Sequence, residues 1–119
     1  LSEPLNHHDA PGYFLDDTDK ARRIIETVGA SNLKLMFDCY HVQILEGDLT
    51  RRLSANLDIT GHIQFAGVPD RGRPDRGEID YRHVFAHIGA LGYDAPLGAE
   101  YKPENGDTDA SLGWMSTLG

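Results

Sequence analysis

Four short apolar segments of this chain each end in a residue whose side chain carries an oxygen atom. These end residues are Glu3, Asp38, Gln64 and Glu100. They follow one another at intervals close to one strand–helix unit, which takes about 30 residues. Barrels built from such units collect their catalytic residues at the carboxyl ends of parallel strands, one or more per strand. The spacing therefore predicts that the four side chains share one edge of a parallel sheet, and it points to an enzyme.

Two kinds of chemistry suit this set of oxygens. Carboxylates and an amide oxygen are hard ligands of the type that Mg²⁺ or Mn²⁺ prefers. Alternatively, Glu3 and Glu100 could act as general base and general acid, provided that burial and a like-charged neighbour raise the pKa of one of them. A single carboxylate at a strand end more often caps a loop or pairs with an arginine. An oxygen-bearing residue at the end of each of four consecutive strands favours a functional site.

Three further polar residues are expected near the same edge as candidates for substrate binding. His41 follows Asp38 by three residues, so we expect it on the loop after that strand, where it binds a substrate oxygen or faces solvent. Arg71 lies in the longest irregular loop, over residues 67–78, and a guanidinium there could hold a carboxylate through two hydrogen bonds. Lys102 could neutralise an anion or pair with Glu104.

The elements that must position these residues alternate regularly along the chain. Strands are predicted over residues 33–38, 61–66 and 96–101, after a first strand that ends at Glu3. Helices are predicted from Asp17 or Thr18 to Gly29, from Asp48 onward, and from Asp80 to Gly92, each starting at a residue that can cap it. A weakly patterned helix is expected from about Thr108. Apolar residues at helical spacing in these segments are Ala21, Ile24, Ile25, Val28, Leu49, Leu53 and Leu57, and Val84, Phe85, Ile88 and Leu91 are predicted to face inward; the last segment holds Leu112 and Met115.

Length and composition limit the interpretation of this pattern. A complete (β/α)₈ barrel takes about 250 residues, and this chain has 119. We therefore expect residues 1–119 to form one unit of about four strand–helix repeats, a half barrel that pairs with an N-terminal half or with a second copy. The formal charge of −8 argues against nucleic acid as a partner. No apolar run is long enough for a membrane span, and the lone cysteine, Cys39, suits a reducing cytoplasm.

Several short motifs along the chain resemble one known family when they are taken together. They are Glu-Pro-Leu-Asn over residues 3–6, Pro-Gly-Tyr-Phe-Leu over 11–15, Phe-Asp-Cys-Tyr-His over 37–41, Gly-His-Ile-Gln over 61–64, Gly-Glu-Ile-Asp-Tyr over 77–81 and Glu-Tyr-Lys-Pro over 100–103. In this order they resemble the C-terminal half of the hydroxypyruvate isomerases and the related 2-oxo-tetronate isomerases, which have xylose-isomerase-like barrels. The resemblance covers essentially the whole chain.

The resemblance implies a fold, a reaction and a set of roles. The fold is a TIM barrel, of which this chain would supply the last four strands. The reaction is an aldose–ketose type isomerisation of a short 2-oxo acid through an enediolate, within carbohydrate metabolism. The family pattern implies Glu3 and Glu100 as acid and base, and Glu3, Asp38, Gln64 and Glu100 as ligands of a divalent metal, with no organic cofactor. Related sugar epimerases have a histidine where this chain has Gln64, so the metal and its necessity stay open.

Three other functions remain as alternatives. A sugar epimerase of the same barrel class would share the glutamate pair but would need a larger pocket for a polyol. An apurinic-site nuclease on a similar barrel would use several zinc ions and many histidines, which fits Gln64 and the negative charge poorly. A half barrel without catalytic activity could instead serve as a binding or dimerisation module.

Overall fold

A small parallel sheet organises the molecule, whose computed structural model describes residues 1–118. The sheet contains β1 (Leu35–Asp38), β2 (Thr60–Phe65) and β3 (Leu97–Ala99), and the strands lie in the order β1-β2-β3. The predicted first strand is reduced to a single parallel bridge between Ser2 and Leu35, on the edge of β1 away from β2. The prediction of parallel strands is confirmed, but only three of the four are extended enough to form a ladder.

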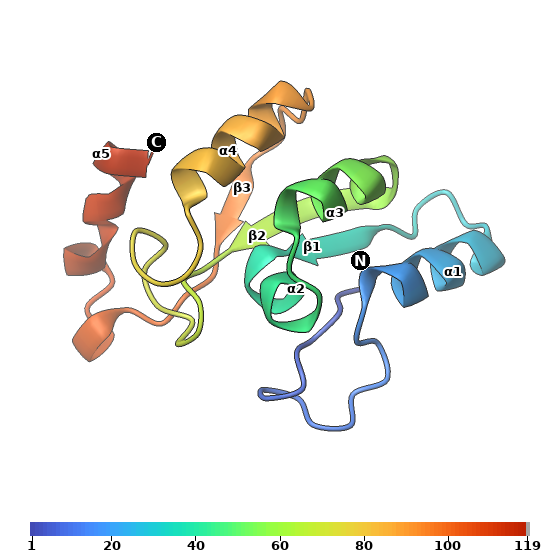
Figure 1. The fold of residues 1–119 in the computed structure, drawn as a ribbon, viewed down its shortest axis with the longest axis horizontal. Coiled ribbons are helices and arrows are strands. Elements are labelled where there is room, and N and C mark those ends of the chain that lie inside the picture. The colour runs from blue at the N-terminus through green and yellow to red at the C-terminus, as the bar shows by residue number, and fades with distance from the viewer. Residues whose placement is uncertain (119) are drawn as a thin grey trace.

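Residues 1–118 also contain five α-helices and three short 3₁₀ helices. The α-helices are α1 (Thr18–Val28), α2 (Cys39–Leu45), α3 (Leu49–Asn56), α4 (Tyr81–Ala90) and α5 (Trp114–Leu118), and the 3₁₀ helices are η1 (Leu57–Ile59), η2 (Glu104–Gly106) and η3 (Asp109–Gly113). Helices α1, α3 and α4 follow one another along one side of the sheet (Figure 1). None of the helices within residues 1–118 has the length and apolar character that would let it cross a membrane.

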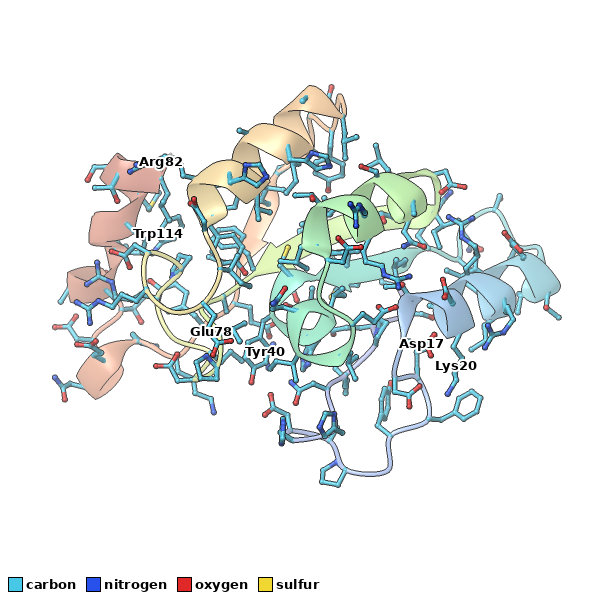
Figure 2. The ribbon with its side chains drawn as sticks, viewed as in Figure 1. Asp17, Lys20, Tyr40, Glu78, Arg82 and Trp114 are labelled. Atoms are coloured by element: carbon cyan, nitrogen blue, oxygen red, sulfur yellow. The ribbon has the colours of Figure 1, made fainter. Side chains whose placement is uncertain are left out.

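Side chains that alternate in direction along the strands separate the hydrophobic core from the polar site. Leu35, Phe37, Ile63 and Phe65 are buried and pack with the helices in one hydrophobic core. Because successive side chains of a strand point to opposite faces, Asp38 and Gln64 lie on the other face of the sheet. Near the C-terminus, Trp114 of α5 packs edge-to-face on Phe65 of β2. Figure 2 labels Trp114. The apolar face of the sheet thus packs against the helices, and the opposite face carries the polar residues of the site.

The predicted starts of α1 and α4 are confirmed. The Asp17 carboxylate accepts a hydrogen bond from the Lys20 amide, and Gly29 ends α1 in the left-handed conformation with φ of 69°. Asp80 caps α4 in the same way, accepting from the amides of Arg82 and His83. Each cap satisfies backbone donors that the first turn of a helix leaves without a partner.

The start of α3 after Asp48 is also confirmed, but without the predicted side-chain cap. Asp48 precedes α3 but makes no capping hydrogen bond, because its φ of 54° is left-handed and a capping residue needs an extended backbone. Val28, which continues the apolar spacing of α1, is exposed, and so are Leu112 and Met115 in the C-terminal segment. All three lie where little of this chain packs over them: Val28 is the last residue of α1, and the C-terminal segment buries Ser111 and Trp114 instead.

Two element boundaries bear directly on the site. Strand β3 is shorter than the predicted 96–101, so Glu100 follows the strand, although its amide still donates to the Phe65 carbonyl oxygen at 3.1 Å. Helix α2 begins directly after Asp38, so the prediction that His41 lies on a loop is wrong. Asp38 is both the end of β1 and the N-cap of α2, since its carboxylate accepts from the Tyr40 amide at 2.9 Å.

Candidate active site

The four oxygen-bearing residues meet at the carboxyl edge of the sheet. Asp38 and Gln64 are register partners on adjacent parallel strands. Glu100 follows β3 directly and remains hydrogen-bonded through its backbone to the end of β2. Glu3 lies beside Asp38 at the other edge of β1. The structure therefore brings together residues that are separated by most of the chain's length.

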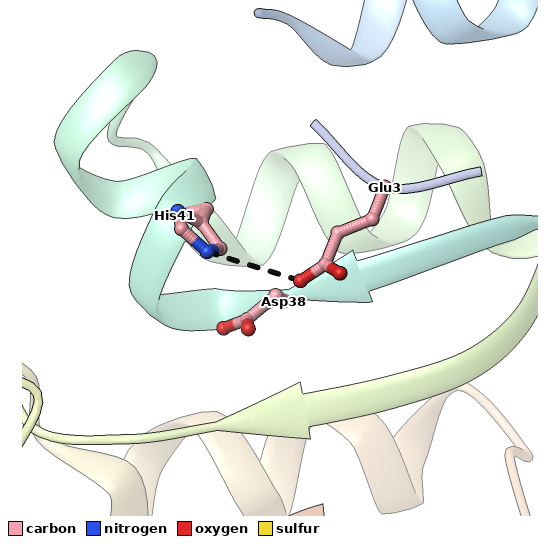
Figure 3. A group of neighbouring side chains, drawn as sticks. All are labelled: Glu3, Asp38 and His41. Atoms are coloured by element: carbon pink, nitrogen blue, oxygen red, sulfur yellow. Dashed lines mark ion pairs between the residues drawn. The ribbon is translucent and has the colours of Figure 1, made fainter. Parts of the chain in front are cut away.

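Glu3, Asp38 and His41 form the buried centre of this edge (Figure 3). One polar atom from each of the three side chains lies within 4.8 Å of the others. The side chains of Asp38 and His41 are 1% and 2% exposed, and that of Glu3 is 26% exposed. The Glu3 Oε1 atom is buried and has no hydrogen-bond partner within the described residues. A buried acceptor without a donor is costly, so this oxygen is poised to receive a proton or a ligand.

The surroundings of Glu3 alter its protonation. Burial, followed by the nearby negative charge of Asp38, raises the pKa of Glu3 from 4.5 to about 7. Glu100 adds to this rise, and the Arg71 guanidinium opposes it. Near neutral pH the carboxyl group of Glu3 is therefore present in both its protonated and its ionised form. That is the condition in which a carboxyl group best transfers protons.

Arg71 links the two sides of the site. Its Nη2 atom lies 3.3 Å from Asp38 Oδ2 and 3.1 Å from Glu100 Oε2, so one guanidinium nitrogen bridges both carboxylates. The guanidinium also stacks on the Tyr40 ring, with 4.9 Å between its central carbon and the ring centre. The Arg71 backbone has a φ of 58°, an uncommon conformation for a residue with a Cβ. These contacts hold the guanidinium over the strand ends, as the sequence predicted for its position.

His41 enters the site from the first turn of α2. Its Nε2 atom lies 3.9 Å from Glu3 Oε1, which is longer than a hydrogen bond and leaves both atoms able to contact a third group. Its Nδ1 atom accepts a hydrogen bond from the Asn6 amide at 2.9 Å. Burial lowers the pKa of His41, so the ring is neutral at pH 7.

Lys102 differs from the other predicted substrate-binding residues. Its side chain is exposed, and only its backbone joins the site, through a hydrogen bond from its amide to the Arg71 carbonyl oxygen at 2.8 Å. The alternative pairing with Glu104 is not found among residues 1–118, because the Glu104 carboxylate contacts Arg76. Lys102 therefore supports the Arg71 loop through its main chain.

Sequence reasoning missed three residues that complete the site. Asn6 is fully buried beside His41, the Tyr40 hydroxyl donates to Asp9 at 2.9 Å, and the Tyr40 ring carries the Arg71 guanidinium. In the sequence, Asn6 and Asp9 look like ordinary residues of a polar loop. One signal was available, because Asp38 could cap a helix and so place Tyr40 and His41 on its first turn.

The donor set fits a divalent metal in its chemistry. The buried oxygens Glu3 Oε1 and Gln64 Oε1 both lack hydrogen-bond partners within residues 1–118, and Asp38 lies between their strands. Oxygen ligands of this type suit Mg²⁺ or Mn²⁺. A cation held there would share the carboxylates of Asp38 and Glu100 with Arg71, which already contacts both.

The fold and this edge of polar residues define the class of protein. A family model described as "Xylose isomerase-like TIM barrel" matches residues 1–118. The chain belongs to this family, and it forms part of such a barrel, as its parallel strands and strand-end residues indicated.

Individual relatives indicate which enzymes of this family the chain is similar to. The chain is 50% identical over 115 residues to a 2-oxo-tetronate isomerase of Cupriavidus necator and 44% identical over 115 residues to a hydroxypyruvate isomerase of Escherichia coli. It is also similar to a crystal structure titled AP endonuclease, family 2, from Brucella melitensis, with a TM-score of 0.91 and 38% identity. Each match covers 97% of this chain and 44% of the other protein. The chain thus spans somewhat less than half the length of these relatives and is similar to isomerases of the hydroxypyruvate isomerase type.

Proposed function

We propose that this chain supplies the glutamate pair and the substrate-binding arginine of an isomerase that interconverts hydroxypyruvate and tartronate semialdehyde, or a related short 2-oxo acid. The observation that carries the proposal is the buried Oε1 atom of Glu3, whose carboxyl group has a pKa of about 7 and lies beside Asp38 and His41. The names of the two isomerases support the same reaction class.

The proposed reaction moves a carbonyl group between adjacent carbons. Ionised Glu3 removes a proton from the hydroxymethyl carbon, and the electrons of that C–H bond form the carbon–carbon double bond of an enediolate while the carbonyl oxygen takes the negative charge. A proton returns to the former carbonyl carbon from Glu100 or from Glu3. The hydroxyl proton passes to the former carbonyl oxygen as the aldehyde forms. The product has the same atoms and the same charge as the substrate.

The other side chains would bind and orient the substrate. The Arg71 guanidinium lies over the strand ends and carries donors that suit the substrate carboxylate. His41 presents Nε2 toward Glu3, where it could donate to the developing oxyanion. A divalent metal held by Glu3, Asp38, Gln64 and Glu100 would, when bound, polarise the carbonyl group and stabilise the negative charge on its oxygen.

A substrate comparison tests this proposal. The complete barrel that contains this chain should isomerise hydroxypyruvate, should act weakly on free ketohexoses, and should not cleave DNA that contains abasic sites. The matched control is Glu26→Gln, which alters an exposed glutamate on α1 and should leave turnover unchanged. Preference for ketohexoses would support the sugar epimerase, and cleavage of abasic DNA would support the nuclease. Either result would reject the isomerase.

We further propose that the barrel is completed by an N-terminal half or by a second copy of this chain. Strand β3 is an edge of the sheet, and the other edge carries only the single bridge at Ser2. Leu1, Phe14 and Val28 are large apolar residues that are 63%, 72% and 59% exposed. Open sheet edges and exposed apolar side chains both favour association. Sedimentation equilibrium on the 119-residue chain should show a dimer or larger species, whereas a cooperative, well-folded monomer would reject this proposal.

A further inference from the structure

We propose that Asn6 is a positioning residue that holds His41 as the neutral tautomer with its proton on Nε2, so that His41 serves the site as a fixed hydrogen-bond donor. The catalytic part of this inference rests on the proposed isomerase function. The tautomer itself does not, because it follows from contacts on the far side of the imidazole ring.

Two donors of Asn6 converge on His41 Nδ1. The backbone amide of Asn6 donates to this nitrogen at 2.9 Å, and the side-chain Nδ2 atom also lies 2.9 Å from it. Asn6 is 0% exposed and His41 is 2% exposed, so water does not compete for these contacts. A backbone amide cannot reverse its polarity. The His41 Nδ1 atom must therefore be the acceptor and cannot carry a proton.

The orientation of the Asn6 side chain is fixed independently of His41. Its Oδ1 atom accepts hydrogen bonds from the backbone amides of His8 at 3.0 Å and Asp9 at 3.1 Å. Its Nδ2 atom also donates to Asp9 Oδ2 at 3.3 Å. A flipped amide would turn its NH₂ group toward two backbone donors and its oxygen toward a carboxylate. The network therefore assigns the nitrogen, and not the oxygen, to the side that faces His41.

The position of the His41 proton follows from these contacts. A neutral imidazole has one N–H, and with Nδ1 occupied as an acceptor the proton lies on Nε2. That atom is 3.9 Å from Glu3 Oε1, on the side of the ring that faces the site. Binding a metal through Nε2 would move the proton to Nδ1, directly against the two donors of Asn6. His41 is accordingly a donor to the substrate and not a metal ligand, although it lies within ligand distance of Glu3 and Asp38.

This arrangement has a chemical consequence for the reaction. A neutral N–H donor stabilises an oxyanion without giving up its proton to it, whereas an imidazolium would protonate the enediolate oxygen early. The donation strengthens as negative charge develops, so its loss should lower kcat more than it raises KM. Asn6 touches neither the substrate nor the reacting carbons in this scheme and acts only through His41.

The test uses Asn6→Asp, with Asn6→Ala as a milder second variant. The aspartate keeps an oxygen for the amides of His8 and Asp9 but places an acceptor beside His41 Nδ1, which should draw a proton onto that nitrogen. The alanine removes only one of the two donors. Asn56→Asp is the matched control, since Asn56 is also buried but its side chain donates to the Arg52 carbonyl oxygen on α3.

The first readout is the ¹⁵N spectrum of imidazole-labelled protein in the complete barrel, with the His41 signals assigned by comparison with His41→Gln. The unaltered protein and Asn56→Asp should show the Nε2–H tautomer. A protonated Nδ1 should stay absent in Asn6→Ala, which keeps the backbone donor, and should appear in Asn6→Asp, whose carboxylate attracts a proton onto the ring. A folded Asn6→Asp protein that keeps the original His41 spectrum would overturn the proposal.

The second readout is the separation of kcat from KM. In Asn6→Asp we expect kcat to fall by about 10- to 100-fold, by analogy with the loss of an outer hydrogen bond to a metal-binding histidine, with a much smaller change in KM. An equal loss in Asn56→Asp, or a changed spectrum with unchanged kcat, would reject the positioning role. The spectrum requires no substrate, so a barrel that shows the tautomer but does not isomerise hydroxypyruvate would reject the proposed function alone.

Discussion

Glu3 and Glu100 occupy equivalent positions at two strand ends, yet the two sides of the site surround them differently. On the Glu3 side the carboxyl group is half-buried, its Oε1 atom has no hydrogen-bond partner within the described residues, and burial raises its pKa to about 7. On the Glu100 side the side chain is 56% exposed, and its carboxylate lies 3.1 Å from Arg71 Nη2. The same residue type is therefore placed once partly buried beside a second carboxylate and once exposed beside a cation.

The comparison shows how one site can contain two carboxyl groups with separate tasks. An acid and a base at the same pH need environments that separate their pKa values. Burial next to Asp38 raises the pKa of Glu3, whereas Glu100 is exposed and paired with the Arg71 guanidinium. The Glu3 side is thus suited to exchanging a proton near neutral pH, and the Glu100 side combines a carboxyl group with the cation proposed to bind the substrate.

The largest effect is expected from removing the two glutamates one at a time. In the complete barrel, Glu3→Gln and Glu100→Gln should each lower kcat by at least about 10²-fold, as expected for a positioned acid or base. Substrate binding should fall less. In the unaltered enzyme the rate should rise as the pH passes 7, because Glu3 must be ionised to remove a proton. The residual rate of Glu100→Gln should keep this rise, and that of Glu3→Gln should lose it.

The outcome decides whether the two sides really differ. If Glu3→Gln retains near-full turnover, Glu3 is not the base and His41 becomes the candidate. If both variants keep the same dependence on pH, the contrast between the two carboxyl groups is wrong even where their loss of rate is as expected.

A smaller effect is expected from Arg71→Met. The substitution removes the proposed carboxylate ligand of the substrate, so KM should rise by about 10-fold, the factor that corresponds to loss of roughly 1.4 kcal/mol of binding. It also leaves buried Asp38 without its cation, which should lower the free energy of unfolding by about 1–3 kcal/mol. Arg73→Met is the control, since Arg73 lies in the same loop but pairs with Asp75. Equal changes in KM for both variants would place substrate binding elsewhere.

A thermal shift should reveal whether the Glu3 side also holds a metal. Mn²⁺ added to metal-free protein should raise Tm by a few degrees for each kcal/mol by which its binding stabilises the folded state. The rise should be much smaller in Gln64→Leu, which removes a buried oxygen and no charge. A shift that is unchanged in Gln64→Leu would exclude this residue as a ligand, and the absence of any shift in the unaltered protein would count against the metal.

The smallest effect concerns stability. The folded state binds the Glu3 proton more tightly than the unfolded state, because the pKa rises from 4.5 to about 7. Stability should therefore fall as the pH increases through this interval, and the penalty should be complete above pH 7. Glu3→Gln removes the penalty, so in metal-free buffer it should have the higher Tm at pH 8 and nearly the same Tm at pH 4.5. Glu100→Gln should show no such gain, since it loses an ion pair with Arg71.

Local sequence determined the framework of this protein. The apolar segments and the oxygen-bearing residues that end them predicted the parallel strands and the shared edge of Glu3, Asp38, Gln64 and Glu100. The starts of α1 and α4 were equally readable, because a capping aspartate acts within its own first turn. Such features depend on residues a few positions apart, and a single sequence contains them.

Only the tertiary structure decided the electrostatics of the site. The raised pKa of Glu3 results from Asp38 and from burial by segments far away in the sequence, and Arg71 reaches Asp38 across 33 residues. The burial of Asn6 against His41 spans 35 residues and turns an ordinary loop asparagine into a determinant of protonation. Helix α2 is too short for a recognisable apolar period, so His41 looked like a loop residue. Side-chain types are local facts, but desolvation and charge–charge contacts exist only once distant segments have packed together.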